Sequence, residues 1–338
     1  MTSREIVQRA LRLQKPPRLP LRFGIFGHDD CGGLPIKAPD GWTPPCEDAD
    51  EWGCVWAKTE IPNMGQVKGH PLEDLSRLDA HPMPDYNDDS RYEEVPGALA
   101  QLEAEGKYIM VGIFMVLFER MHTLHGFENT LCDLLTDRPA AAALADRILD
   151  VHLTLVESIG RRFPGRVHGF GMTDDWGTQQ AAFISLDLWR DFFLPRYQRL
   201  FAAMHAIGCD VWVHSCGKVN EIIEGYIEAG VNAVNLQQPR ALGIEEIGRR
   251  YRGRIVLESL ADIQHTLPTG DRDKIRADAR DLMSHWALPS GGFVFSDYGD
   301  GAAIGVHDLE TKVFMYRCFS EESKRLYGEP LPEPKLPV

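Results

Sequence analysis

The stretch CDVWVHSCGKVNEIIEGYIEAGVNAVNLQ, residues 209–237, indicates the fold because it contains one complete strand–helix–strand unit. Its ends, 209–215 and 231–237, are short apolar runs typical of buried strands. The segment between them carries apolar residues at the i, i+3, i+4 spacing of a helix with one buried face: Val219, Ile222, Ile223, Tyr226 and Ile227. Gly230 follows where a helix stop belongs. A helix between two such strands favours a parallel sheet.

The same alternation extends over most of the chain. We count eight candidate strands: 20–26, 51–57, 107–114, 165–172, 209–215, 231–237, 253–259 and 292–297. Helical stretches separate most of them, and the longest opens at Pro139 and runs to about Arg162. Eight strands in this order predict an α/β fold, a single (β/α)8 TIM barrel over residues 1–338. Its length would also suit two average domains, but such barrels commonly reach it as one.

Two segments stand outside this alternation. Residues 1–14 predict a surface helix, because Thr2 and Glu5 match a capping box and the scattered charges differ from a secretory signal. Residues 65–94 are rich in Pro and Asp, and we expect a surface excursion there. The longest apolar run, 108–118, is far shorter than the ~20 residues of a membrane helix. We therefore expect a cytoplasmic protein.

The composition excludes several classes of partner. The chain has 50 Asp and Glu against 36 Lys and Arg, a formal net charge of −14, without a basic run. Nucleic acids and anionic membranes are bound through Lys and Arg, so neither is an expected partner. The seven cysteines are an odd number without framework spacing, which favours reduced thiols or a metal site over disulfides.

Polar residues follow one predicted strand after another. In chain order they are His28, Asp29, Asp30, Glu119, Arg120, Asp174, Asp175, His214, Cys216, Gln237, Gln238, Glu258, Asp297 and Asp300. Loops are polar in any case, which explains each residue taken singly. Their shared position beyond apolar strands is less easily explained that way, because the carboxyl ends of barrel strands form the active-site face.

The sharpest local signal is His214-Ser215-Cys216-Gly217. Residues two apart in a strand point to the same side, so His214 and Cys216 can both face the barrel mouth. Imidazole nitrogen and thiolate sulfur bind zinc at about 2.1 and 2.3 Å. A His and a Cys two residues apart also occur by chance, so this pair alone is weak evidence for a metal.

This segment, together with DDWGTQ (174–179), LFERMHTLHGFE (117–128) and GHPLEDLSRLD (69–79), resembles the uroporphyrinogen decarboxylase superfamily. The resemblance covers nearly the whole chain and is closer to the methyltransferase branch than to the decarboxylases. The decarboxylases carry an arginine-rich signature after the first strand, where this chain has GIFGHDDCGG (24–33). Acids at that place disfavour an octacarboxylate porphyrinogen, because like charges would meet.

The resemblance implies a zinc ion held by His214, Cys216 and a third residue. The family's second Cys, after the last strand, aligns with Asp300 of YGDG (298–301), and Glu258 and Cys31 are the alternatives. Cys209 is excluded because it begins the strand that ends near Cys216, roughly 23 Å away at ~3.3 Å per residue. A carboxylate in place of a thiolate predicts a stronger Lewis acid, suited to an ether or alkoxide oxygen.

Further site residues follow from their places beyond the strands. Asp174, Asp175 and Glu119 are candidate catalytic groups, although the sequence does not separate the two aspartates and one of them can serve only as a helix cap. Candidate substrate-binding residues are Trp176, Gln179, Tyr298, Arg120 and His28. Buried core is the commoner role for the two aromatic residues.

The resemblance predicts a zinc-dependent methyltransferase that acts between a small methylated compound and a corrinoid (cobalamin) carried by a partner protein. The stronger Lewis acid expected from a carboxylate ligand favours a methyl ether, such as a methoxyarene, as that compound. A homodimer is a further expectation from the family. Two alternatives stay open: a metal-free barrel that binds a small ligand or a corrinoid, and a decarboxylase of the same superfamily.

Overall fold

The computed structural model describes residues 1–58 and 65–336. Within them, eight parallel strands form one sheet in the order β1-β10-β9-β8-β7-β6-β5-β2. The strands are β1 (Leu21–Arg22), β2 (Cys31–Gly33), β5 (Tyr108–Ile113), β6 (Gly169–Thr173), β7 (Asp210–His214), β8 (Ala233–Asn235), β9 (Val256–Ser259) and β10 (Phe293–Ser296). The amide of Asp30 donates to the carbonyl of Leu21 at 2.9 Å and so links the two edges of the sheet. The predicted (β/α)8 barrel is confirmed in this nearly closed form.

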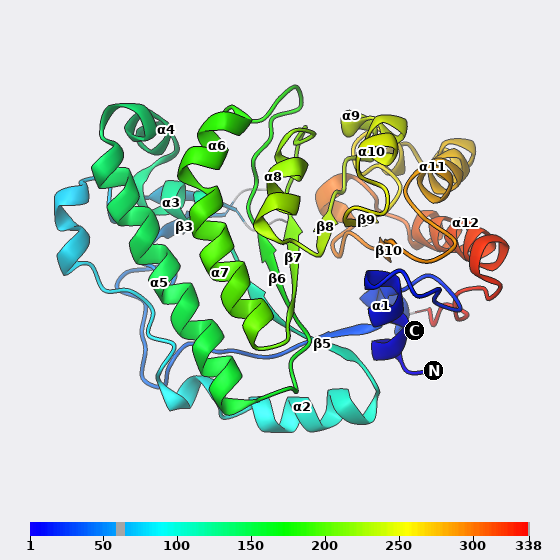
Figure 1. Cartoon of the computed structure of the whole chain (residues 1–338), viewed down its shortest axis with the longest axis horizontal. Helices are drawn as coiled ribbons and strands as arrows, with labels where there is room; N and C mark the ends of the chain where they lie inside the picture. Colours follow the sequence, from blue (N-terminus) through cyan, green and yellow to red (C-terminus); the bar gives the residue numbers. More distant parts are fainter. Residues whose placement is uncertain (59–64, 337–338) are drawn as a thin grey trace.

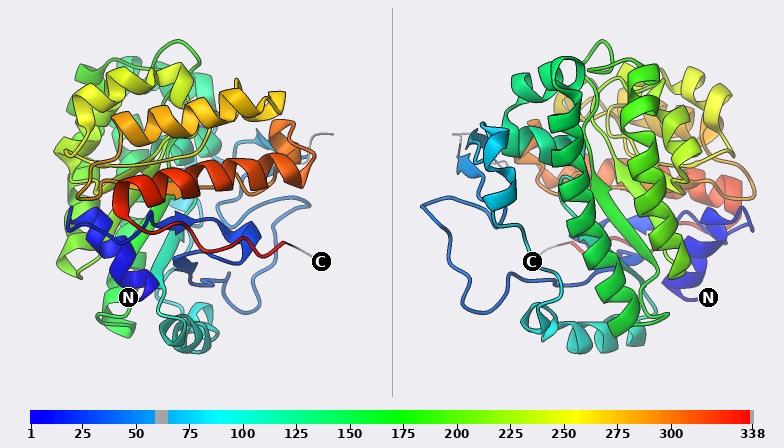
Figure 2. Two further views of the ribbon diagram at one scale, coloured as in Figure 1. Left: turned by 90° about the vertical axis from the view of Figure 1, so that its right-hand side faces the viewer. Right: turned by 60° about the vertical axis from the view of Figure 1, so that its left-hand side comes forward.

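Helices surround the strands on the outside of the barrel (Figure 1). They are α2 (Val95–Ala104), α3 (Phe118–His125), α4 (Phe127–Thr136), α5 (Arg138–Arg162), α6 (Leu186–Phe192), α7 (Leu194–Ala206), α8 (Ile222–Ala229), α9 (Pro239–Leu242), α10 (Ile244–Tyr251), α11 (Arg272–His285) and α12 (Leu309–Tyr327). The predicted helix from Pro139 is α5, and its first turn is capped by Asp137, which accepts from the amide of Ala140. Figure 2 shows α11 and α12 side by side across one flank.

The N-terminal helix α1 (Ser3–Leu11) closes the barrel at the amino ends of the strands. The predicted capping box is present, because Thr2 accepts from the amide of Glu5 and Glu5 accepts from the amide of Thr2. Val7 is fully buried among inward-facing side chains near the amino ends of the strands, including those of Met110 and Trp212. Access to the barrel interior is therefore from the opposite end, where the strands finish.

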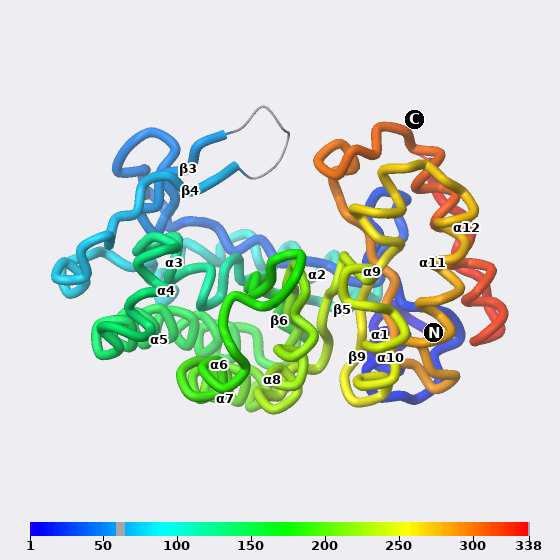
Figure 3. Tube along the Cα trace, turned by 90° about the horizontal axis from the view of Figure 1, so that it is seen from above, coloured from blue at the N-terminus to red at the C-terminus, as the bar shows by residue number. Residues whose placement is uncertain are grey.

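One predicted strand does not belong to the barrel. Within 51–57, β3 (Val55–Ala57) pairs antiparallel with β4 (Gln66–Gly69) in a separate two-stranded sheet. Figure 3 shows this pair beside α3, away from the barrel strands. The second barrel strand is Cys31–Gly33, whose small residues give no apolar run for sequence reasoning to detect. The excursion accordingly begins earlier than the predicted residue 65.

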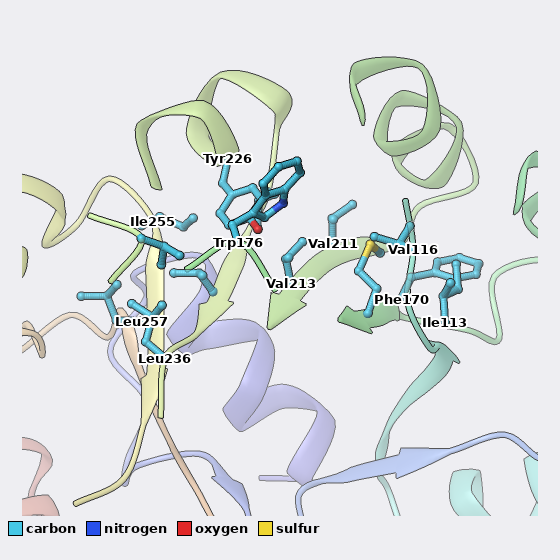
Figure 4. Packing of buried hydrophobic residues seen from close by; sticks show 14 of the residues in the cluster. Ile113, Val116, Phe170, Trp176, Val211, Val213, Tyr226, Leu236, Ile255 and Leu257 are labelled. Carbon is cyan, nitrogen blue, oxygen red and sulfur yellow. The ribbon is translucent and has the colours of Figure 1, made fainter. Parts of the chain in front are cut away.

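Alternate strand residues pack outward beneath the helices. Phe170, Val211, Val213 and Leu257 belong to this main apolar cluster and are almost completely buried (Figure 4). The residues between them along the strands point into the barrel, and this alternation of period two decides which side chains can form a site.

None of the helices in residues 1–58 and 65–336 is long and apolar enough to cross a membrane.

Candidate metal site at the barrel mouth

Strand register brings four inward-facing side chains together near the carboxyl ends of the strands. Thr173 of β6 is level with His214 of β7, His214 with Asn235 of β8, and Asn235 with Glu258 of β9. Cys216 and Asp175 each follow two residues beyond an inward-facing position, so the same alternation carries them into the mouth.

Among the described residues, one group of three can hold a metal ion: Asp175, His214 and Cys216, whose ligand atoms all lie within 4.8 Å of one another. The Nε2 atom of His214 lies 3.2 Å from Sγ of Cys216 and 3.6 Å from Oδ1 of Asp175. The amide of Cys216 donates to the same Oδ1 at 2.7 Å, which holds the carboxylate against the thiol.

These distances fit zinc. Nitrogen and sulfur ligands at about 2.1 and 2.3 Å around a tetrahedral ion are roughly 3.6 Å apart, and nitrogen and oxygen ligands roughly 3.4 Å. The three side chains therefore already stand near the spacing that the ion requires. They provide three protein ligands, the number typical of catalytic zinc sites.

A hydrogen-bond chain orients the histidine from behind. Glu258 accepts from Arg22 at 3.1 Å and from Nδ2 of Asn235 at 2.7 Å, which turns Oδ1 of Asn235 toward His214. That oxygen lies 2.6 Å from Nδ1 of His214 and can only accept. The network thus assigns the proton to Nδ1 and leaves the lone pair of Nε2 facing Cys216.

The surroundings of Cys216 favour a bound cation. Burial, and then the adjacent carboxylate of Asp175, raise the pKa of this thiol well above its usual value. A thiolate at this position therefore needs a positive charge beside it, which a metal ion provides.

The site opens into a cavity of about 750 Å³ inside the barrel mouth. Asp175, His214 and Cys216 are on its wall, together with Glu119, Tyr298 and Arg22. Burial, followed by the carboxylates of Asp175 and Asp174, raises the pKa of Glu119 to about 8. Its Oε2 atom has no hydrogen-bond partner among the described residues. A cavity of this size suits a small molecule.

The structure separates the two aspartates of DDWGTQ. Asp174 is fully buried and accepts from the amides of Phe118 and Glu119, at 3.2 and 2.8 Å, and from the hydroxyl of Tyr197. It therefore caps the amino end of α3 and is absent from the cavity wall described above. Burial raises the pKa of Asp174 to about 7, against the opposing effect of these hydrogen bonds.

The three predicted third ligands lie outside the cluster of Asp175, His214 and Cys216. Asp300 is exposed, and its Oδ1 accepts from the amide of Ala302 at 3.0 Å. Glu258 is engaged by Asn235 and Arg22. Cys31 begins β2 level with Tyr108, near the amino ends of the strands, although it borders the lower part of the cavity. Among the described residues, the carboxylate that lies beside His214 and Cys216 is that of Asp175.

The predicted substrate-binding residues are divided in the same way. Tyr298 borders the cavity. Arg120 is buried against the excursion, where it pairs with Asp50 at 3.3 Å and stacks over Trp52. Trp176 is fully buried and stacks on Phe118 with ring centroids 4.2 Å apart, so it is core.

The remaining two residues of that set, Gln179 and His28, lie away from the cavity wall. Gln179 is exposed in the loop after β6. Nε2 of His28 is 2.6 Å from the carbonyl oxygen of Glu333 near the carboxyl terminus. The structure therefore brings Tyr298 alone of these five residues to the cavity.

Sequence reasoning missed Asn235 and Arg22. Asn235 lies inside a predicted strand, level with His214, and the alternation of period two was sufficient to place it on the same wall. Arg22 lies inside the first predicted strand, whereas the candidate residues were those that follow the strand ends.

Fold and site define a nearly closed (β/α)8 barrel with a His/Cys/Asp cluster of metal-binding geometry at its mouth. Residues 57–301 match the family model described as Uroporphyrinogen decarboxylase (URO-D). The chain belongs to this family.

Comparison with solved structures agrees on the fold. A methyltransferase from Methanosarcina mazei superposes with a TM-score of 0.67 at 15% identity, over 95% of this chain and 99% of that chain. The native xylanase 10B from Thermotoga maritima gives a TM-score of 0.39 at 11% identity, over 88% and 86%. No curated protein matches the sequence.

Proposed function

We propose that this protein is a zinc-dependent methyltransferase that transfers a methyl group from a small methyl ether, such as a methoxyarene, to a corrinoid carried by a separate protein. The observation that carries the proposal is the cluster of Asp175, His214 and Cys216, with Nε2 of His214 oriented toward it by Asn235. The likeness in fold to the Methanosarcina mazei methyltransferase agrees with it.

The acidic character of the cavity supports methyl transfer over porphyrinogen decarboxylation. Asp29, Glu119, Asp175, Glu258 and Asp297 all border it, whereas Arg22 is the only Arg or Lys on its wall among the described residues. Arg22 is already paired with Glu258. A substrate with many carboxylates would meet like charges there, and the expectation from GIFGHDDCGG points the same way.

The roles of the chain's own groups follow from this geometry. His214, Cys216 and Asp175 would hold zinc, which as a Lewis acid would favour departure of the ether oxygen. In the overall reaction the methyl carbon–oxygen bond breaks, the methyl group passes to cobalt(I) of the corrinoid, and the aryloxide takes up a proton. The unpartnered Oε2 of Glu119 supports a role for this carboxyl in holding that proton near the leaving oxygen.

Metal content is the first test. Protein purified without chelators should contain nearly one zinc per chain, and His214→Ala and Cys216→Ala should lose it. Cys209→Ala is the matched control, because Cys209 is a buried thiol at the opposite end of the same strand segment, bonded to the carbonyl of Val167 at 3.4 Å. Metal-free, folded wild-type protein would favour the metal-free binding barrel instead.

Activity is the second test. The zinc protein is incubated with cob(I)alamin and methoxyarenes, and in parallel with methylcobalamin and a thiol acceptor. Methylation of cobalt with release of the phenol supports the proposal. Transfer to the thiol alone would overturn the ether assignment, and release of carbon dioxide from a small acid without metal would identify a decarboxylase.

A further inference from the structure

Three glycines face the interior of the barrel on β2, β5 and β6. Gly33 and Gly112 are exposed, although the rest of β5 is buried, and both border the cavity with Gly171. Gly112 is paired in register with Gly171, so two of the glycines are side by side on neighbouring strands. Backbone conformation does not require glycine here, since none of the three has a positive φ.

Space is what these glycines provide. A Cβ atom built on Gly33 or Gly112 would meet nothing within 4 Å, and on Gly171 only the terminal methyl group of Met110 at 3.2 Å. Glycine inside a strand weakens it and marks places where a ligand approaches the backbone closely. These three residues, which we call the glycine wall, present bare backbone to the cavity.

The rim above the glycine wall is aromatic. Phe114, the next inward residue of the β5 segment after Gly112, borders the cavity and is 45% exposed. Its ring stacks on that of Trp56 from β3 at 6.0 Å between centroids. Bare backbone below an aromatic rim suits a flat group, because a planar ring can lie close to both.

The charges around the cavity disfavour an anion beside this wall. Arg22, its only cation among the described residues, is held by both carboxylate oxygens of Glu258 at 3.1 and 3.2 Å and lies over the ring of Trp212. The carboxyl groups of Asp29 and Glu119 also border the cavity. A zinc ion held by neutral His214, the Cys216 thiolate and the Asp175 carboxylate would carry no net charge, so a negatively charged substituent would lose its hydration without gaining a free positive partner.

We infer that the glycine wall of Gly33, Gly112 and Gly171 is the binding surface for the ring of the methyl donor, and that this donor is an aromatic methyl ether without a negative charge. The inference rests on the proposed function for the identity of the reacting group. The wall sets the size of the donor and the charged groups around the cavity exclude an anion, whereas Asp175, His214 and Cys216 act on its ether oxygen.

Binding measurements test the inference without corrinoid and without turnover. The probes are 1,2-dimethoxybenzene and its anionic analogue 3,4-dimethoxybenzoate, titrated into the zinc protein by calorimetry. We expect the neutral probe to bind at least tenfold more tightly than the anionic one. Absence of binding by the neutral probe, or equal or tighter binding of the anion, would overturn the inference.

Variants locate the ring. Gly112→Ala and Gly112→Leu place side chains in the open space of the cavity and should weaken binding of 1,2-dimethoxybenzene progressively, by tenfold or more for leucine. Gly97→Leu is the matched control, because Gly97 is exposed on α2 and a Cβ there also meets nothing within 4 Å. Zinc content should stay unchanged, and the melting temperature should not fall, in all three variants. Unchanged affinity in folded Gly112→Leu protein would refute the assignment of the wall.

These outcomes are independent of those for the proposed function. If 1,2-dimethoxybenzene binds at the glycine wall but transfers no methyl group to cob(I)alamin, the proposed reaction fails and the binding surface stands. If methoxyarenes are demethylated but Gly112→Leu binds and reacts as wild type does, the reaction stands and the glycine wall fails.

Discussion

Asn235→Ala is the most informative single substitution, because Asn235 contacts His214 without being a metal ligand itself. Its Oδ1 lies 2.6 Å from Nδ1 of His214, and its Nδ2 donates to Glu258 at 2.7 Å. Removing the amide leaves the imidazole without the acceptor that fixes its proton on Nδ1. We therefore expect the zinc affinity to fall although all three ligands are intact.

The size of the effect follows from the role of the lost contact. Losing the partner that orients a zinc-bound histidine typically costs 10- to 100-fold in metal affinity, or about 1.4 to 2.7 kcal/mol. We expect the upper part of this range, because the substitution also releases Glu258 from one of its donors. Glu258→Gln retains the shape but not the charge that turns the amide of Asn235, so its effect should be smaller, up to about tenfold.

The assay is competition for zinc between the protein and a chromophoric chelator, with melting temperature measured in parallel. Asn232→Ala is the control, because Asn232 also lies close to a histidine, 2.9 Å from Nε2 of His205, and accepts from the amide of Val211. It lies at the other end of the same strands. A purely structural role predicts lower melting temperatures in both variants with zinc affinity equal to wild type.

Zinc affinity within twofold of wild type in Asn235→Ala would refute the orienting role. A larger loss in Glu258→Gln than in Asn235→Ala would instead identify Glu258 as a ligand, as one reading of the sequence allowed.

Three further predictions concern single side chains. Asp175→Asn should lower zinc affinity at least tenfold while Asp300→Asn stays within twofold, by the same chelator competition; the reverse order would restore Asp300 as the ligand. Trp176→Ala should cost about 3 to 5 kcal/mol in urea unfolding because the buried ring stacks on Phe118, and a loss below about 1 kcal/mol would contradict a core role. Burial raises the pKa of Asp29 from 3.8 to about 6, so its contribution to stability is complete below pH 3.8 and is lost as the pH rises through 6. Asp29→Asn should therefore flatten the melting temperature between these pH values, and an unchanged slope would count against the raised pKa.

The barrel was predictable from the sequence because its strands and helices have different periods. Unit 209–237 shows both, and β7, α8 and β8 lie within it. The strand Cys31–Gly33 was not predictable in this way, because Cys-Gly-Gly has neither an apolar run nor β-branched residues. Residues 51–57 have the apolar run, but the strand within them, β3, pairs antiparallel with β4. Tertiary contacts, which the local sequence does not reveal, determine this pairing.

The candidate site was predictable for residues in or next to strands, where side chains alternate between the two faces. It was not predictable for residues in the loops. The period that puts Cys216 beside His214 also puts Asp175 two residues after Thr173, on the inner side, and leaves Asp174 facing the helices. Applied strictly, it separates the two aspartates from the sequence alone. Asp300 lies in a loop, where side chains do not alternate with a fixed period. Alignment to a family pattern gives its position in the sequence but not the direction in which its side chain points.

The two sides of the barrel mouth differ in how closely their residues are linked by contacts, and this difference affects which substitutions each side can accept. The proposed metal ligand His214 and the residues that orient it, Asn235 and Glu258, come from consecutive strands β7 to β9, and their hydrogen bonds join these positions. Gly33 and Gly112 on the opposite strands touch no side chain where a Cβ would be, so substitution there alters the cavity without disturbing that network. Distant sites contribute independently when they share no partners. We therefore expect the substrate range to vary with substitutions of the glycines while the proposed chemistry at Asp175, His214 and Cys216 is preserved.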